Sequence, residues 1–253
     1  RLGTAVRKWF YQHAINKSRC IFTVSQFSAE RIRSLLHFPA SKPLVVTYNA
    51  VPHWFTEDGE NLEMPADFKE ATASFQSRGR DLLFVGNIKA HKGLHILLPA
   101  FKLARKRGLN ARLVIVGNAG NFRTGDDSIL EQFQSLPEEA FSFTGRIGDS
   151  QLRDLYRQCR LLVQPSLYEG FGMPPLEALT QGANVVLSNI PVFCEIYRNL
   201  PVTFFKCGDV EDLAEKLLVA WRLPPPSGWE NPYSFKKTAR IIFDTICQKS
   251  GKN

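Results

Sequence analysis

Short apolar segments alternate with helical patterns along most of the chain, and this alternation constrains the fold more than any other feature. Six segments are rich in β-branched or other apolar residues, namely residues 82–85, 112–116, 141–144, 161–164, 184–187 and 202–205. The stretches between them carry apolar residues at helical spacing. Strands that are separated by helices pair in parallel through right-handed crossovers. The sequence therefore predicts an α/β fold with a doubly wound parallel sheet.

The rest of the chain divides into three parts around this sheet, which we expect to span residues 81–222. Residues 1–52 contain two helical patterns (4–17 and 28–37) and two strand patterns (20–24 and 44–48). Residues 53–80 lose this periodicity and are rich in polar residues, which predicts a linker or surface loop. Residues 223–253 begin with the break LPPPSGW and continue as an amphipathic helix from Ser234 to about Ile246.

The loop after the first strand of the sheet is a candidate anion site. Ligands of doubly wound sheets bind beyond the carboxyl ends of the strands. This loop contains Gly86, Asn87, Lys89 and Lys92 and leads into a helix, so a phosphate could approach its backbone and its two lysines. The alternative is a βα turn with solvated lysines. The loop matches neither the P-loop nor the G-x-G-x-x-G pattern, which disfavours an NAD-dependent dehydrogenase.

The loop after the third strand contains Gly145, Arg146 and Ile147. Glycine at this place would let a flat ring lie against the backbone, whose N–H and C=O groups would contact the edge of a base. A tight turn into the next helix explains the same residues, and the sequence by itself favours the turn.

The loop after the fourth strand carries the strongest signal. Gly170 and Gly172 precede a helix start that is marked by two prolines, and two carboxylates, Glu169 and Glu177, lie on either side of the glycines. Exposed N–H groups at a helix start hold a diphosphate or sugar hydroxyls, and ionised carboxylates suit the vicinal hydroxyls of a ribose or a hexose. We expect Glu177 in the first turn, where the helix dipole alone would also explain it. For Glu169, the alternative to a binding role is that of an acidic residue in a solvated loop.

Other classes of protein fit these residues less well. Glycosidases also use paired carboxylates, but this pair lies at a phosphate-binding helix start in a sheet type that binds nucleotides. The net charge of +8 suits a phosphate-bearing substrate, an anionic membrane or a nucleic acid. A nucleic acid is disfavoured because the 19 Phe residues fall mostly in strands and on helix faces, not among Lys and Arg.

A metal centre and a membrane span are not expected. The five cysteines show no C-x-x-C spacing and predict free thiols of a cytosolic protein. His91 and His95 lie four residues apart, but no carboxylate accompanies them at ligand spacing. No apolar stretch approaches the ~18 residues of a membrane helix, and the chain has no signal-type segment.

The loop after the fourth strand reads Tyr168-Glu169-Gly170-Phe171-Gly172, and the chain continues to Glu177, Gly182 and Ser188-Asn189. These residues resemble the retaining glycosyltransferases of the GT-B fold that carry a glutamate-x7-glutamate motif, a group that includes bacterial mannosyl- and glucosyltransferases. By this resemblance, residues of about 80–221 look like the family's nucleotide-sugar-binding Rossmann-like domain. Residues of about 18–52 look like the end of its N-terminal domain, and the last helix resembles the one that packs back onto that domain.

The resemblance implies a role for each candidate residue. Glu169 would contact the donor sugar, and the backbone amides of Gly170, Phe171 and Gly172 would help to hold sugar hydroxyls and phosphate. Glu177 would bind the ribose hydroxyls.

In the other two loops, Lys92 would bind the diphosphate and ease its departure together with the helix dipole, so that Lys92 and Glu169 are the catalytic candidates. The loop of Gly145, Arg146 and Ile147 would hold the base. Many members have Arg directly after the glycine of the first strand. This chain has Asn87 there, and Lys89 would supply the second positive charge.

The implied reaction of the complete enzyme is transfer of a hexose, mannose or glucose, from a GDP- or UDP-sugar with retention. The acceptor would be a hydroxyl of a lipid-linked, glycan or small-molecule substrate, as in polysaccharide biosynthesis. No metal or other cofactor is expected, and the chain has no Asp-x-Asp. The family's N-terminal domain would need about 150 residues ahead of Arg1. The chain is therefore expected to be a donor-binding half that is inactive alone. A nucleotide-binding module without catalysis is the alternative.

The first helical pattern carries basic and aromatic residues side by side, among them Arg7, Lys8, Trp9 and Phe10. Such a helix is typical of peripheral contact with an anionic membrane, here the inner face. The competing interpretation, which we favour, is that Trp9, Phe10 and Ile15 cover the missing N-terminal domain.

Overall fold

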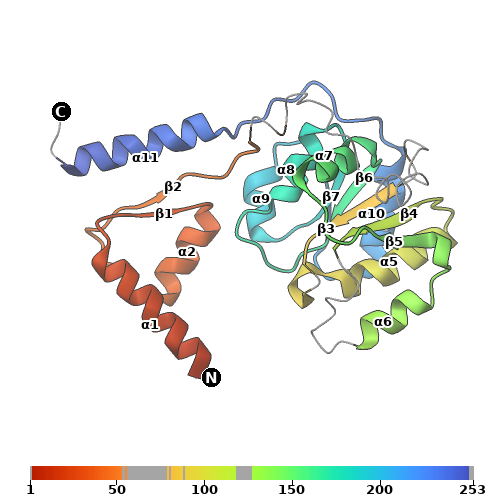
Figure 1. Cartoon of the computed structure of the whole chain (residues 1–253), viewed down its shortest axis with the longest axis horizontal. Helices are drawn as coiled ribbons and strands as arrows, with labels where there is room; N and C mark the ends of the chain where they lie inside the picture. Colours follow the sequence, from red (N-terminus) through yellow and green to blue (C-terminus); the bar gives the residue numbers. More distant parts are fainter. Residues whose placement is uncertain are drawn as a thin grey trace.

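The computed structural model describes residues 2–52, 55, 79, 81–87, 89–117 and 127–250. Its largest sheet has six parallel strands in the order β5-β4-β3-β6-β7-β8 (Figure 1). The strands are β3 (Asp81–Val85), β4 (Arg112–Val116), β5 (Phe141–Phe143), β6 (Leu161–Gln164), β7 (Asn184–Ser188) and β8 (Thr203–Phe205). Counted along the sheet domain, this is the 3-2-1-4-5-6 order of doubly wound nucleotide-binding sheets. The predicted fold class is confirmed, and the strand order reverses between β3 and β6.

Helices cover both faces of this sheet (Figure 1). One face packs against α5 (Leu94–Lys106) and α10 (Val210–Arg222), and α6 (Asp127–Gln134) adds Phe133 to the same cluster. The other face packs against α7 (Asp149–Gln158), α8 (Met173–Thr180) and α9 (Pro191–Tyr197).

The side chains of β3 show why the sheet needs both layers. Leu82 and Phe84 belong to one core cluster, and Leu83 and Val85 belong to the other. All five residues of β3 are buried, as expected for a parallel strand that is covered on both faces. The apolar runs of β3, β6 and β7, which are buried throughout, therefore correspond to central strands.

The N-terminal part forms a separate small unit (Figure 1). It consists of α1 (Leu2–Lys17), β1 (Ile21–Thr23), α2 (Gln26–Leu35) and β2 (Leu44–Val46), and β1 pairs in parallel with β2. The last helix, α11 (Phe235–Ser250), returns to this unit, where the Thr238 hydroxyl donates to the carbonyl oxygens of Thr47 and Tyr48 at 2.8 and 3.1 Å.

The linker that we predicted at residues 53–80 lies outside the described residues, except for Phe55 and Gly79. The sequence did not single out α9, a helix of seven residues that begins at Pro191. Within the described ranges, no helix is long and apolar enough to cross a membrane.

Candidate functional site

The loops that follow β3 and β6 contact each other where the strand order reverses. The backbone N–H of Leu167 donates to the carbonyl oxygen of His91 at 2.8 Å. Gly93 has a left-handed backbone with φ of 77°, and a Cβ added there would lie 1.9 Å from the carbonyl oxygen of Pro165. Only glycine fits at this position, and the two loops are therefore held in contact at a point where doubly wound sheets bind ligands.

Lys92 and Glu169 form an ion pair across these two loops. The Lys92 Nζ lies 2.6 Å from Glu169 Oε1, and the two side chains are only 18% and 11% exposed. The Ser166 hydroxyl donates to the same oxygen at 2.8 Å, and Gln164 Nε2 donates to the Ser166 hydroxyl at 3.1 Å. The structure thus brings together two residues that are 77 positions apart.

Two further candidates in the loop after β3, Asn87 and Lys89, differ from Lys92 in their exposure. Both Asn87 and Lys89 are exposed. The carbonyl oxygen of Lys89 accepts a bond from the backbone N–H of Lys92 at 2.9 Å. Lys89 therefore shapes the turn through its backbone, and its side chain faces solvent.

The glycine loop, residues 170–172 between β6 and α8, is held in place by contacts from both sides. The side chain of Phe171 is buried and packs edge-on against Tyr233, with ring centroids 5.5 Å apart, so only the Phe171 backbone is available to a ligand. Gly172 begins α8 with φ of 83°, and a Cβ there would lie 2.4 Å from Phe193. The carbonyl oxygen of Gly170 accepts bonds from the hydroxyls of Ser25 at 2.7 Å and of Ser28 at 3.3 Å.

The sequence did not point to the contact between α2 and this loop. Besides the bonds from Ser25 and Ser28 to Gly170, the Glu195 carboxylate on α9 accepts the backbone N–H groups of Gln26 and Phe27 at 2.7 and 2.8 Å. A carboxylate at a helix N-terminus satisfies free N–H groups and complements the helix dipole. The start of α2 is therefore joined to the sheet domain beside Glu169.

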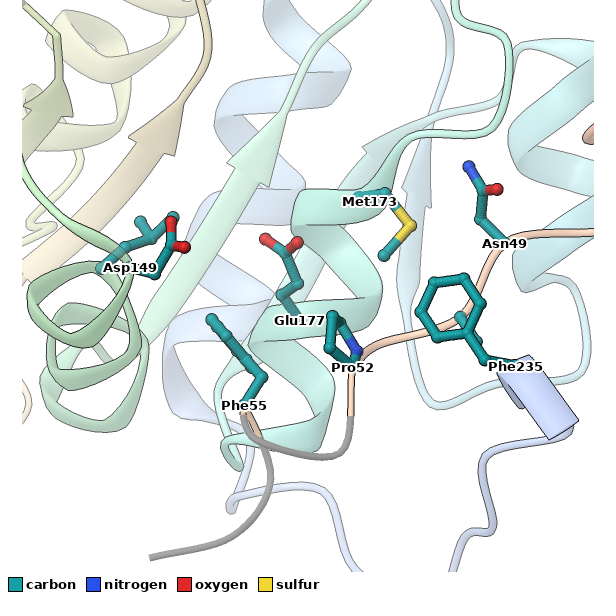
Figure 2. A pocket seen from close by; sticks show the side chains of 9 residues that line it. Asn49, Pro52, Phe55, Asp149, Met173, Glu177 and Phe235 are labelled. Carbon is teal, nitrogen blue, oxygen red and sulfur yellow. The ribbon is translucent and has the colours of Figure 1, made fainter. Parts of the chain in front are cut away.

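Glu177 lines a pocket of about 360 Å³ (Figure 2). The other lining residues are Asn49, Ala50, Pro52, Phe55, Asp149, Leu152, Met173 and Phe235. Figure 2 shows the Glu177 carboxylate between Asp149 on one side and Met173 on the other. The pocket thus combines residues of the N-terminal unit, the sheet domain and α11.

The position of Glu177 on its helix corrects one expectation. Gly172 is the N-cap of α8, which makes Glu177 the fifth residue of the helix and places it in the second turn. No acidic residue lies in the first turn. Because dipole effects fade beyond the first turn, stabilisation of the helix start does not explain Glu177.

The ionisation of Glu177 is perturbed by its surroundings. Burial raises the pKa of the Glu177 carboxyl, and the nearby charge of Asp149 raises it further. The Tyr156 hydroxyl, which donates to Glu177 Oε2 at 2.9 Å, lowers that pKa by stabilising the charged form.

The second candidate loop lies next to this pocket. The backbone N–H of Gly145 donates to the carbonyl oxygen of Gly117 at 3.1 Å, which joins the loops after β4 and β5. Arg146 is exposed, and Ile147 packs against the core cluster of α7 and α8. Asp149, two residues further on, begins α7 and lines the Glu177 pocket. The three predicted loops therefore lie along one edge of the sheet.

Potential metal ligands do not gather in the described part of the chain. There, no group of three or more His, Cys, Asp or Glu side chains could hold a metal ion. All five cysteines are free thiols.

Residues 67–240 match the family model described as glycosyl transferases group 1. The chain is 30% identical over 179 residues to an uncharacterized glycosyltransferase of Methanocaldococcus jannaschii. This match covers 71% of this chain and 44% of that protein. It is 29% identical over 187 residues to the O-antigen chain mannosyltransferase B of Escherichia coli, with 72% and 46% covered. The chain thus spans less than half the length of these two relatives.

Solved structures give the same fold at lower identity. A glycosyltransferase from Rickettsia africae matches with a TM-score of 0.73 at 18% identity, over 95% of this chain and 66% of that chain. The Anabaena protein Alr3699/HepE, crystallised with UDP and glucose, matches with a TM-score of 0.68 at 19% identity, over 92% and 60%.

Proposed function

Because the chain belongs to the family of group 1 glycosyl transferases and has their GT-B type of fold, we propose that it is the donor-binding half of a retaining hexosyltransferase. The donor is a GDP- or UDP-sugar, with mannose or glucose as the hexose. The mannosyltransferase relative supports mannose as the hexose. The UDP and glucose bound to the Anabaena protein support UDP-glucose as the alternative donor. The acceptor is a hydroxyl group of a lipid-linked, glycan or small-molecule substrate.

One observation carries this proposal: the ion pair of Lys92 with Glu169 and the pocket of Glu177 lie at the carboxyl edge of the same parallel sheet. A nucleotide sugar needs a cation for its diphosphate and hydrogen-bond acceptors for the hydroxyls of its ribose and hexose. We assign the diphosphate to Lys92 and the start of α8, the hexose to Glu169 and the ribose to Glu177. The base would contact the loop of Gly145, Arg146 and Ile147.

The ion pair gives the binding step a specific form. Without a ligand, Lys92 and Glu169 satisfy each other in a largely buried place. When a diphosphate binds to Lys92, the ammonium group exchanges a carboxylate for a phosphate oxygen, and Glu169 becomes free to accept a sugar hydroxyl. During transfer, Lys92 and the N–H groups at the start of α8 stabilise the charge that grows on the leaving diphosphate. Retention means that the new glycosidic bond keeps the anomeric configuration of the donor.

No metal takes part in this proposal, since the positive charge comes from Lys92 and the helix start. Calorimetric titration of GDP and UDP in the presence of EDTA tests it. We expect at least one nucleotide to bind with a dissociation constant below 1 mM, and Lys92→Ala to weaken binding about tenfold or more.

Lys216→Ala is the matched control, because Lys216 lies on α10 in a pair with Asp212 and should not affect binding. Failure of both nucleotides to bind, or binding that EDTA abolishes, would contradict the proposal. Nucleotide binding without sugar transfer in a protein of full family length would favour the alternative, a nucleotide-binding module without catalysis.

A further inference from the structure

The carboxylate of Glu177 has an unusual environment for an acid that must stay ionised. Among the residues that the structure describes, no Lys, Arg or His forms an ion pair with it. Asp149 faces it across the pocket, and Phe55, Leu152 and Met173 line the pocket around it. Burial favours the protonated form of Glu177, and the negative charge of Asp149 favours it as well.

Tyr156 supplies the one hydrogen bond to this carboxylate that comes from the described part of the chain, at 2.9 Å to Oε2. The Tyr156 side chain is fully buried, and its ring packs edge-on against Phe55 with centroids 5.9 Å apart. The phenol therefore cannot turn to solvent. It joins α7 to α8, the helices that follow β5 and β6.

Among the described residues, no donor bonds to Oε1 of Glu177, and this oxygen is therefore available to a ligand. A carboxylate has two oxygens with about four acceptor positions, and Tyr156 occupies one of them on Oε2. Oε2 accepts no second bond from the described part of the chain either, and Figure 2 shows the carboxylate directed into the pocket. A ligand with two adjacent hydroxyl groups can then donate to the remaining positions.

We propose that Tyr156 is a positioning residue, which holds Glu177 ionised and oriented for the paired hydroxyls of the ligand's ribose. This inference rests on the proposed function, because it is the nucleotide that brings the ribose. Tyr156 itself does not touch the ligand. Its hydroxyl acts through Glu177 only.

The ionisable groups around Glu177 give the sign of the expected pH effect. Asp149 and burial raise the pKa of Glu177, and Tyr156 is the group that lowers it. Tyr197 on α9, the other phenol whose pKa Glu177 affects, is fully buried and neutral, because burial raises its own pKa well above the ordinary value. Removal of the Tyr156 hydroxyl therefore shifts protonation of Glu177 to higher pH.

The first test is independent of any ligand. Tyr156→Phe keeps the ring and removes the hydroxyl, and Tyr233→Phe is the matched control, because the Tyr233 hydroxyl donates to the carbonyl oxygen of Ile196 instead. The Glu177 carboxyl is titrated by carbon-13 NMR and assigned with Glu177→Gln. We expect a higher titration midpoint in Tyr156→Phe and an unchanged one in Tyr233→Phe. An unchanged midpoint in Tyr156→Phe overturns the inference.

The second test uses GDP and UDP together with their 2′-deoxy analogues. In the wild-type protein the deoxy analogue of the better nucleotide should bind about tenfold more weakly, since one donor to Glu177 is lost. Tyr156→Phe should weaken binding of the ribonucleotide about tenfold and weaken binding of the deoxy analogue much less. It should also raise the pH below which the ribonucleotide no longer binds well. Equal losses for both ligands mean a merely structural role and overturn the inference. If wild-type protein binds neither nucleotide, the proposed function fails, and the ribose role of Tyr156 fails with it.

Discussion

At the scale of single residues, Gly93 shows how the site constrains the sequence. Gly93 and Gly182 have nearly the same left-handed backbone, with φ of 77° and 83°, but a Cβ at Gly182 meets no atom within 4 Å. Gly182→Ala should therefore cost only the backbone strain, about 1 kcal/mol. Gly93→Ala adds a collision with Pro165 and should cost several kcal/mol more or prevent folding.

Urea unfolding of both variants measures the difference. Equal losses in the free energy of unfolding would mean that the two loops can move apart at little cost.

Glu177 illustrates a conflict between function and stability. Burial raises its pKa in the folded protein above the unfolded value, so the ionised carboxylate destabilises the ligand-free fold at neutral pH. Glu177→Gln keeps an acceptor for Tyr156 and removes the charge, and should therefore raise the free energy of unfolding at pH 7. The gain should vanish as the pH falls and the wild-type carboxyl takes up its proton. Urea unfolding from pH 4 to 8 checks this, and a less stable variant at pH 7 would contradict it.

At the scale of elements, the start of α2 joins the N-terminal unit to the glycine loop. Ser25 caps α2 by accepting the N–H of Ser28 at 3.0 Å, and it donates to Gly170. Ser25→Ala should cost about 1–2 kcal/mol of unfolding free energy, because the cap and a buried bond are both lost. Ser34→Ala is the control, since Ser34 is exposed on the same helix and its hydroxyl donates to the carbonyl oxygen of Arg31. A loss no larger than that of the control would exclude α2 as a support of the loop.

The elements themselves were largely predictable from the sequence, and the contacts between them were not. The six strands of the sheet follow from apolar runs, and β3, β6 and β7 are buried throughout because central parallel strands are covered on both faces. The glycine loop and both of its glutamates follow from local spacing. Ser25 and Gly170, in contrast, are 145 residues apart, and nothing in either segment indicates their bond. Tyr156 reads in the sequence as one more residue on the apolar face of α7, since periodicity does not show where a phenol hydroxyl points.

At the scale of the whole molecule, α1 presents large exposed side chains. Trp9, Phe10 and Tyr11 are each more than 60% exposed, next to Arg7 and Lys8. Ile15, which we expected to face the N-terminal domain as well, is instead buried in the structure and only 4% exposed. We expect Trp9 and Phe10 to pack against that domain in a protein of full family length. Such a protein should then remain in the supernatant equally with neutral and anionic vesicles at low salt. Sedimentation that needs anionic lipid and falls as salt rises would show peripheral membrane contact instead.

The central claim is that one nucleotide sugar spans the site, with its ribose at Glu177 and its hexose at Glu169. Calorimetric titration of Glu169→Ala and Glu177→Ala with a free nucleotide and with the corresponding nucleotide sugar tests this most directly, using GDP with GDP-mannose and UDP with UDP-glucose. Glu177→Ala should weaken both ligands by about 1.5–3 kcal/mol, because each loses a charged acceptor of the ribose. Glu169→Ala should leave the affinity for the free nucleotide undiminished and weaken only the nucleotide sugar. Equal losses for both ligands in both variants would contradict the account.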